Sequence, residues 1–174
     1  MVFVDECGTH TSMTRLRARA PRGERAYGRV PRNRGKNPTL IASMGPEGMG
    51  PSLAVVGSTT KVVFEAYVEE VLAPSLRPGQ VVMMDNLGAH RGERVRELVE
   101  ARGCELLFLP PYSSPDFSPI EEAFSKIKAL LRKVEARTGG DLVGAIGRAL
   151  SAVTNQDSKD FFGHCGYPLV DQPS

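Results

Sequence analysis

The segment from Leu109 to Glu122 places the strongest constraint on how this chain can fold. It continues an apolar run into Pro110-Pro111-Tyr112-Ser113-Ser114-Pro115-Asp116-Phe117-Ser118-Pro119-Ile120-Glu121-Glu122. Ser118 followed by Pro119 is typical of a helix start, because serine is a good N-cap and proline suits the first helical position. The segment therefore predicts a strand, a connection and a helix with an acidic residue in its first turn.

Two earlier apolar runs also end in acidic residues. The run 2–4 leads into Asp5-Glu6, and the run 81–84 leads into Asp85-Asn86. Consecutive side chains of a strand point to opposite faces, so only one of Asp5 and Glu6 can face a shared site. Clustered carboxylates repel one another unless a cation compensates, and Mg²⁺ prefers oxygen ligands. Three converging acids indicate a two-metal site for phosphoryl transfer.

The order of the expected elements is that of a mixed α/β protein. Apolar runs predict strands over 2–7, 39–44, 52–58, 81–84 and 104–109, and helical periodicity predicts helices over 61–73, 91–102, 119–136 and 141–153. Turn-forming residues over 45–51 suggest that the second and third strands form an antiparallel pair. Three strands followed by alternating helices and strands fit an α/β, RNase H-like mixed sheet of about five strands flanked by helices. In that topology the first strand lies centrally, beside the fourth.

The acidic segments also carry a resemblance to a known family. Asp85-Asn86 with His90, followed by the 109–122 segment, resembles the catalytic domain of bacterial insertion-sequence transposases of the mariner superfamily. Between Asp85 and Glu121 lie 35 residues, close to the spacing that the family keeps. Ser118 stands where the family commonly has Asn, and one extra Ser precedes Pro115. The resemblance extends from Asp5 to Tyr167, nearly the whole chain.

The resemblance implies a complete set of functional expectations. Asp5, Asp85 and Glu121 would be the catalytic residues and the ligands of two Mg²⁺ or Mn²⁺ ions, with Asp5 and Asp85 on neighbouring strands. Water would hydrolyse a phosphodiester at the transposon end, and the freed 3′-hydroxyl would attack target DNA. Residues 1–174 would form one catalytic domain without the family's N-terminal helix-turn-helix region. Such a chain would act as a homodimer or with a separate DNA-binding half, on double-stranded DNA.

Two of these assignments have rival explanations in the sequence. Ser118 and Glu121 also match a capping box, in which Glu121 would only satisfy the helix start. On a helical wheel Glu121 lies beside the apolar stripe, whereas Glu122 points away from it and should be solvated. Asn86 and His90 are possible accessory residues, and His90 would either orient a phosphate or water or make a structural hydrogen bond.

Basic residues are concentrated in one stretch of the chain. Residues 15–36 hold nine basic residues and one acidic residue, a net charge of +8, which leaves −6 for the rest of a chain with net charge +2. An arginine-rich loop or hairpin in an otherwise acidic protein is typical of nucleic-acid binding, although a solubilising loop has the same composition. The expected DNA-binding residues are Arg15, Arg17, Arg19, Arg22, Arg25, Arg29, Arg32, Arg34, Lys36, Lys128 and Arg132.

Two other functions remain compatible with the sequence besides an active transposase domain. A different RNase H-like endonuclease would share the fold and metal, and a non-catalytic remnant would bind DNA or a full-length transposase. No apolar run approaches the roughly 18 residues needed to span a bilayer, and the first residues lack the pattern of a signal peptide. We therefore expect a cytoplasmic protein without a membrane partner.

Overall fold

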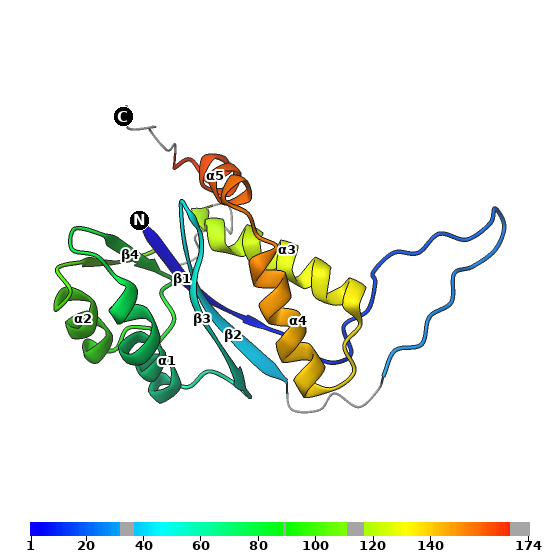
Figure 1. Cartoon of the computed structure of the whole chain (residues 1–174), viewed down its shortest axis with the longest axis horizontal. Coiled ribbons are helices and arrows are strands. Elements are labelled where there is room, and N and C mark those ends of the chain that lie inside the picture. The colour runs from blue at the N-terminus through cyan, green and yellow to red at the C-terminus, as the bar shows by residue number, and fades with distance from the viewer. Residues whose placement is uncertain (32–36, 89, 111–116, 168–174) are drawn as a thin grey trace.

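A five-stranded mixed sheet forms the centre of the computed structural model, which describes residues 1–31, 37–88, 90–110 and 117–167 (Figure 1). The strands are β1 (Val2–Gly8), β2 (Pro38–Gly45), β3 (Gly48–Val56), β4 (Val81–Met84) and β5 (Glu105–Phe108). The helices are α1 (Lys61–Tyr67), α2 (Glu93–Glu100), α3 (Pro119–Val134), α4 (Gly139–Ser151) and α5 (Asn155–His164). The strand order is β3-β2-β1-β4-β5.

The pairing of β1 with its two neighbours determines which residues the sheet brings side by side. β1 pairs antiparallel with β2 and parallel with β4, and Val4 stands opposite Met84 in the parallel pair. The first strand therefore lies centrally beside the fourth, which confirms the expected RNase H-like arrangement. The antiparallel pairing of β2 with β3 is also confirmed.

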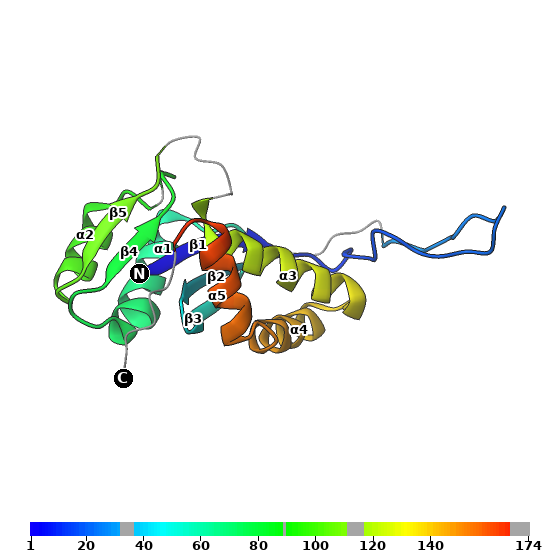
Figure 2. The same ribbon diagram turned by 90° about the horizontal axis from the view of Figure 1, so that it is seen from above.

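Helices cover both faces of the sheet and create two apolar cores. On one face α3, α4 and α5 pack over residues such as Phe3 and Cys7, and on the other α1 and α2 pack over Val4 and Ile41 (Figures 1 and 2). The residues of β1 alternate between these cores because strand side chains alternate between faces. Asp5 thus shares the α3 side with Phe3 and Cys7, and Glu6 shares the α1 side with Val4.

Several element boundaries differ from the sequence prediction. The expected linker over 45–51 is mostly strand, because β2 and β3 extend to a tight turn at Pro46 and Glu47. The helix expected over 61–73 is α-helical only to Tyr67 and continues as a π-helical turn over Val68–Leu72 and a 3₁₀ turn over Ala73–Ser75. Pro74 lies within this last turn, where it lacks the N–H that a regular helix needs.

The C-terminal part contains one helix that the sequence prediction missed. The helix expected over 141–153 begins two residues earlier, because Gly139 and Gly140 open α4 behind the N-cap Thr138. After α4 the chain forms α5, whose start is held by a capping box between Thr154 and Asp157. α5 contacts both α3 and β3, so it completes the cover of that face.

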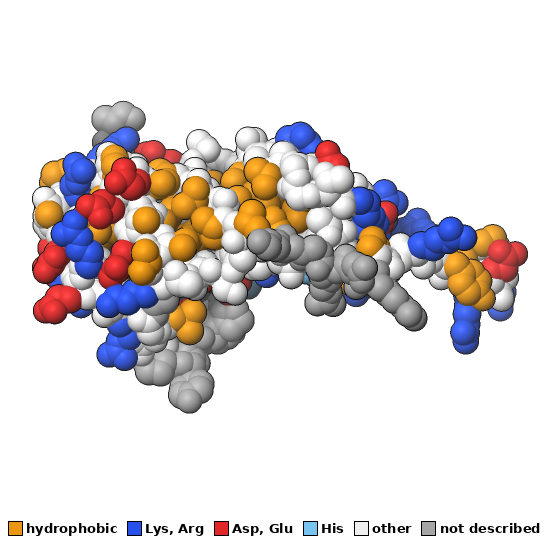
Figure 3. Space-filling view, turned by 90° about the horizontal axis from the view of Figure 1, so that it is seen from below, with side chains coloured by type: hydrophobic (Ala, Val, Ile, Leu, Met, Phe, Trp, Pro, Cys, Tyr) orange, Lys and Arg blue, Asp and Glu red, His pale blue; other side chains and the backbone are white. Residues whose placement is uncertain are grey.

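The basic stretch leaves the body of the protein between β1 and β2. We call its described residues, 15–31, the arm. They form no helix or strand, are nearly all exposed, and project far beyond the sheet (Figure 2). Basic side chains line the arm in the space-filling view, whereas acidic and basic side chains mix over the opposite end of the molecule (Figure 3). None of the described helices combines the length and the apolar character that crossing a bilayer would require.

Candidate active site

Asp5 and Asp85 lie side by side where β4 ends. Val4 and Met84 are opposite each other in the parallel β1–β4 pair, so the next residue of each chain segment falls at the same level. Asp5 Oδ1 accepts a hydrogen bond from the Glu6 backbone N–H at 2.7 Å. The carboxyl ends of parallel strands are where open α/β sheets bind ligands, which suits Asp85 to a site at this edge.

Glu121 approaches Asp5 from the first turn of α3. Ser118 is the N-cap of α3, but its side chain makes no capping hydrogen bond. The capping-box explanation of Glu121 is therefore wrong. The charge of Glu121 acts on Asp5 instead, together with that of Asp85.

The pKa of Asp5 is raised mainly by burial and further by the neighbouring acids. Burial raises the pKa of Asp5 to about 7, and the charges of Glu121 and Asp85 add to the rise. The hydrogen bond from the Glu6 N–H and the positive charge of His90 oppose it. Asp5 therefore keeps its proton far more readily than an exposed aspartate, as expected of acids that share a site.

The three acids fit a divalent cation by their chemistry. Within the described residues, no three His, Cys, Asp or Glu side chains are close enough to form a ready-made metal site. The acids nevertheless offer only carboxylate oxygens, the ligands that Mg²⁺ and Mn²⁺ prefer. A cation would also remove the repulsion that helps to raise the pKa of Asp5. The donor set thus suits such an ion, although its side chains must draw together to bind one.

His90 lies behind Asp85 and has no exposed surface. Its Nδ1 is hydrogen-bonded to Asp85 Oδ1 and its Nε2 to Glu6 Oε1 at 3.0 Å. The ring also packs against Phe64 of α1, with 4.1 Å between ring centroids. A fully buried ring cannot touch a phosphate or a water in the site, so the structure favours the alternative of a structural hydrogen bond.

This pairing changes the pKa of both partners. Burial alone would lower the pKa of His90, but the hydrogen bonds with Asp85 and Glu6 raise it to about 9. Burial alone would raise the pKa of Asp85, but the hydrogen bonds from His90 and from the Leu87 N–H, at 3.1 Å, hold it below its ordinary value. At neutral pH the arrangement therefore favours an imidazolium between two carboxylates.

Glu6 and Glu122 both have partners that sequence reasoning missed. Glu6 does face away from Glu121, as the strand alternation predicts, but its carboxylate contacts His90 and thereby reaches Asp85. The one signal in the sequence was that strand alternation places Glu6, an acidic residue, on a face of the sheet that a helix covers. Glu122, expected to be solvated, is bonded to His164 of α5 and only 31% of its side chain is exposed.

The other described candidate residues outside the arm are all half-buried. Asn86 follows Asp85 and is half-buried. Lys128 and Arg132 are half-buried on α3. Lys128 lies close enough to Cys7 of β1 to oppose the effect of burial, which raises the pKa of Cys7 to about 12.

A groove connects the end of α3 with the base of the arm. Its lining residues are Arg15, Leu16, Arg17, Ala129, Arg132 and Lys133. In the arm, Arg15, Arg17, Arg19, Arg22, Arg25 and Arg29 are all exposed. Arg32, Arg34 and Lys36 lie outside the described residues, as does the 111–116 part of the acidic segment. A row of basic side chains thus runs from beside the acids toward the arm.

The amino-acid sequence over residues 1–143 matches the family described as DDE superfamily endonuclease. The chain belongs to this family. A search of curated protein sequences gave no match.

Solved structures with the same fold include three of Mos1 transposase. A paired-end complex with the left transposon end is 20% identical, with a TM-score of 0.74 over 96% of this chain and 52% of that one. A strand transfer complex is 19% identical, with a TM-score of 0.69 over 96% and 51%. The isolated catalytic domain is 16% identical, with a TM-score of 0.63 over 96% and 76%. These likenesses show the fold, and this DDE endonuclease chain spans about half the length of the first two.

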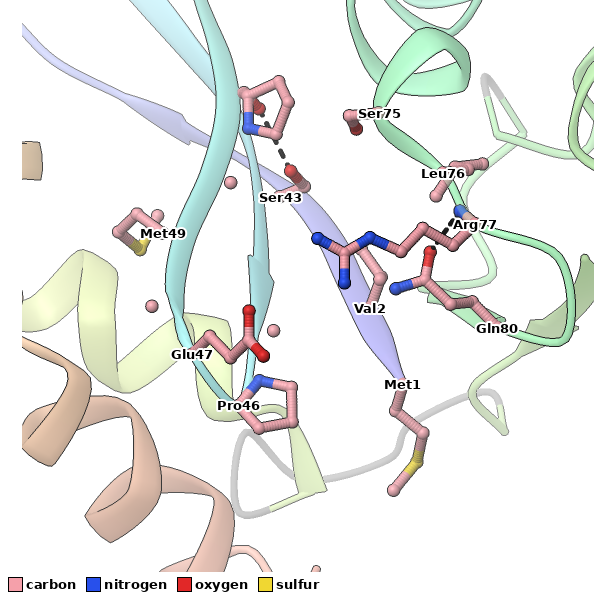
Figure 4. Close-up of a pocket in the computed structure, with 14 residues that line it drawn as sticks. Met1, Val2, Ser43, Pro46, Glu47, Met49, Ser75, Leu76, Arg77 and Gln80 are labelled. Carbon is pink, nitrogen blue, oxygen red and sulfur yellow. Dashed lines mark hydrogen bonds between the residues drawn. The ribbon is translucent and has the colours of Figure 1, made fainter. Parts of the chain in front are cut away.

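A second hollow of this DDE endonuclease lies at the other end of the sheet. It has a volume of about 510 Å³ and is bordered by the start of β1, the β2–β3 turn and the residues before β4. In Figure 4 the Arg77 side chain extends across it toward Glu47, and the Arg77 N–H donates to Gln80 Oε1 at 2.8 Å. None of the candidate acids lines it. The acidic site is therefore separate from this hollow.

Proposed function

We propose that the chain is the catalytic domain of an insertion-sequence DNA transposase. It would hydrolyse a phosphodiester bond at a transposon end and join the freed 3′-hydroxyl to target DNA. The observation that carries the proposal is the approach of Asp5, Asp85 and Glu121 from β1, β4 and α3 in a DDE superfamily endonuclease. The fold likeness to a Mos1 strand transfer complex supports it.

We assign Asp5, Asp85 and Glu121 as the ligands of two Mg²⁺ or Mn²⁺ ions. Mos1 paired-end complexes with Mg and with Mn support the choice of metal. Such ions supply a more acidic attacking water or hydroxyl and stabilise the leaving oxygen. The fold brings the three carboxylates together, from β1, from the end of β4 and from the first turn of α3. Asp85 commits Oδ1 to hydrogen bonds from Leu87 and His90, which leaves Oδ2 for binding.

We assign the basic row as the path of the DNA backbone. Lys128 and Arg132 lie on the same α3 edge as Glu121, and Arg132 shares its groove with Arg15 and Arg17. Guanidinium groups match phosphate oxygens in geometry and charge. A duplex on this path would contact the arm while one of its phosphates lies at the acids.

The proposal includes partners beyond DNA. We propose that the protein works as a homodimer or with a separate DNA-binding half that recognises the transposon ends; the fold likeness to a Mos1 paired-end complex with a transposon end supports this. Action on chromosomal DNA would place it in the cytoplasm.

Nicking of supercoiled plasmid tests the catalytic assignment without knowledge of the transposon ends. With Mg²⁺ or Mn²⁺ present, the wild-type chain should nick the plasmid, and Asp85→Asn and Glu121→Gln should each lower the rate by about 100-fold or more. The matched control is Glu122→Gln, which changes the neighbouring acid in the same helix turn and should leave the rate unchanged.

Two outcomes would contradict the proposal. A wild-type chain that binds plasmid but never nicks it, with either metal, would point to a non-catalytic remnant that interferes with a full-length transposase. Equal losses in Glu121→Gln and Glu122→Gln would show that α3 contributes general stability rather than a metal ligand.

A further inference from the structure

We propose that Glu6 and His90 form a buried link that fixes the orientation of Asp85, which makes Glu6 a positioning residue for the metal site that it faces away from. The inference rests on the proposed role of Asp85 as a metal ligand. It assigns a function to Glu6, which strand alternation places on the opposite face of β1 from Asp5.

The link joins three separate parts of the fold. His90 lies in the turn after β4, Glu6 lies in β1, and their contact spans 84 positions of the sequence. Each ring nitrogen of His90 has a carboxylate partner, Asp85 on one side and Glu6 on the other. Phe64 packs against the ring, and the ring has no exposed surface. The imidazole is thus held from three directions while both of its carboxylate partners are present.

This fixed ring limits what the Asp85 carboxylate can do. The terminal torsion of an aspartate side chain is soft, so an unrestrained carboxylate at a strand end samples many orientations. Here Oδ1 is bonded both to His90 Nδ1 and to the Leu87 N–H, at 3.1 Å for the latter. With Oδ1 fixed by two donors, Oδ2 is the oxygen left to face Asp5 and the metal. Partners one shell behind metal ligands commonly orient them in this way.

Glu6 is the outer anchor of the link. Only 18% of its side chain is exposed, and its Oε1 lies 3.0 Å from His90 Nε2. Without this acceptor, the Nε2–H would be buried without a partner, which favours any movement of the ring that finds one. Movement of the ring would release Asp85 Oδ1. A change at Glu6 should therefore reach the metal site although Glu6 touches no metal.

The test compares metal affinity with fold stability in the complete chain. Mn²⁺ is titrated by calorimetry, plasmid nicking gives kcat and KM, and urea unfolding measures stability. Glu6→Ala should weaken Mn²⁺ binding by about 10-fold and lower kcat while the KM for plasmid stays the same. Glu6→Gln should restore most of both values, because its amide oxygen can accept the same N–H.

A matched control separates this effect from general loss of an acid. Glu69→Ala removes the Glu69–Arg94 ion pair, at 2.8 Å, which joins the helical layer on the same side of the sheet. It should change neither Mn²⁺ affinity nor kcat. His90→Asn provides a second variant, because its amide N–H can still donate to Asp85 but cannot reach Glu6. It should weaken Mn²⁺ binding as Glu6→Ala does.

The outcomes distinguish failure of the link from failure of the proposed function. If Glu6→Ala and His90→Asn keep Mn²⁺ affinity within twofold while Asp85→Asn abolishes binding, the link is only structural. If Asp85→Asn also leaves Mn²⁺ affinity unchanged, the metal assignment itself is wrong, and the link falls with it.

Discussion

Asp5 and Glu6 are neighbours in the chain, yet each meets a different electrostatic environment. Asp5 faces α3 and feels the negative charges of Glu121 and Asp85, whereas Glu6 faces α1 and meets His90. Strand alternation was enough to predict that the two acids separate. It could not predict the partner of Glu6, because His90 reaches it only through the turn that follows another strand. The unpredicted part of the site is thus the part built by tertiary contact.

The raised pKa of Asp5 makes the stability of the metal-free protein depend on pH. Asp5 titrates at about 7 in the folded state against 3.8 ordinarily, so its contribution is complete below pH 3.8 and is lost as pH rises through 7. Asp5→Asn removes the buried charge. Its gain in unfolding free energy should therefore be larger at pH 8 than at pH 5, by about 1 to 3 kcal/mol. Urea unfolding at both values with a chelator present measures this difference.

Asp160→Asn is the control for this prediction, because Asp160 is exposed on α5 and hydrogen-bonded to Gln156 within the same helix. It should change stability by less than about 0.5 kcal/mol at either pH. A gain at Asp5 that is equal at pH 5 and pH 8 would show that its carboxyl titrates normally.

At the scale of elements, the sequence was informative where one pattern dominated. β4 begins and ends where its apolar run does, and α3 starts at Pro119 as expected. The π-helical turn after α1 was not predictable, because the apolar periodicity that predicts a helix does not show where its winding changes. α5 was missed because its apolar residues show only a weak helical period. In the structure this helix packs against α3 and β3.

The capping box of α5 gives the element-scale prediction. Thr154 Oγ1 accepts a hydrogen bond from the Asp157 N–H at 3.1 Å, and Asp157 Oδ2 accepts one from the Thr154 N–H at 2.7 Å. Thr154→Ala should lower the free energy of unfolding by about 1 kcal/mol, because it leaves one helix-start N–H without this partner. Thr154→Ser should retain most of the stability. Thermal or urea unfolding of the two variants checks the assignment, and equal losses would mean that the methyl group matters rather than the hydroxyl.

At the scale of the molecule, charge and shape are divided between the body and the arm. The arm's exposed arginines should give sequence-independent binding to duplex DNA, with log affinity falling linearly with log salt by roughly 0.9 per phosphate contacted. Joint replacement of Arg15, Arg17, Arg19 and Arg22 by Ala should weaken binding and reduce that slope. The losses should be similar on unrelated duplexes, because phosphate contacts carry no sequence information. Fluorescence anisotropy over a salt series measures both effects.

A variant with the same charge change on the body serves as the control. Arg77, Arg94, Arg96 and Arg102 lie away from the arm, and their joint replacement by Ala removes four positive charges as well. This control should keep the salt slope of the wild type. Equal slopes in all three proteins would show that the arm is only a solvated loop.

The base of the arm has a consequence for how this protein can vary. Thr9 donates to the Pro38 carbonyl through its N–H at 2.9 Å and its Oγ1 at 2.8 Å, and Arg137 binds the carbonyls of Thr11 and Met13. The two ends of the excursion are therefore fastened to the body independently of what lies between them. Because closing a longer loop costs little extra entropy, insertions and deletions here should be tolerated while β1 and β2 stay in register. The arm is in this sense an exchangeable module, and each added residue extends its reach by at most about 3.6 Å without disturbing the acids.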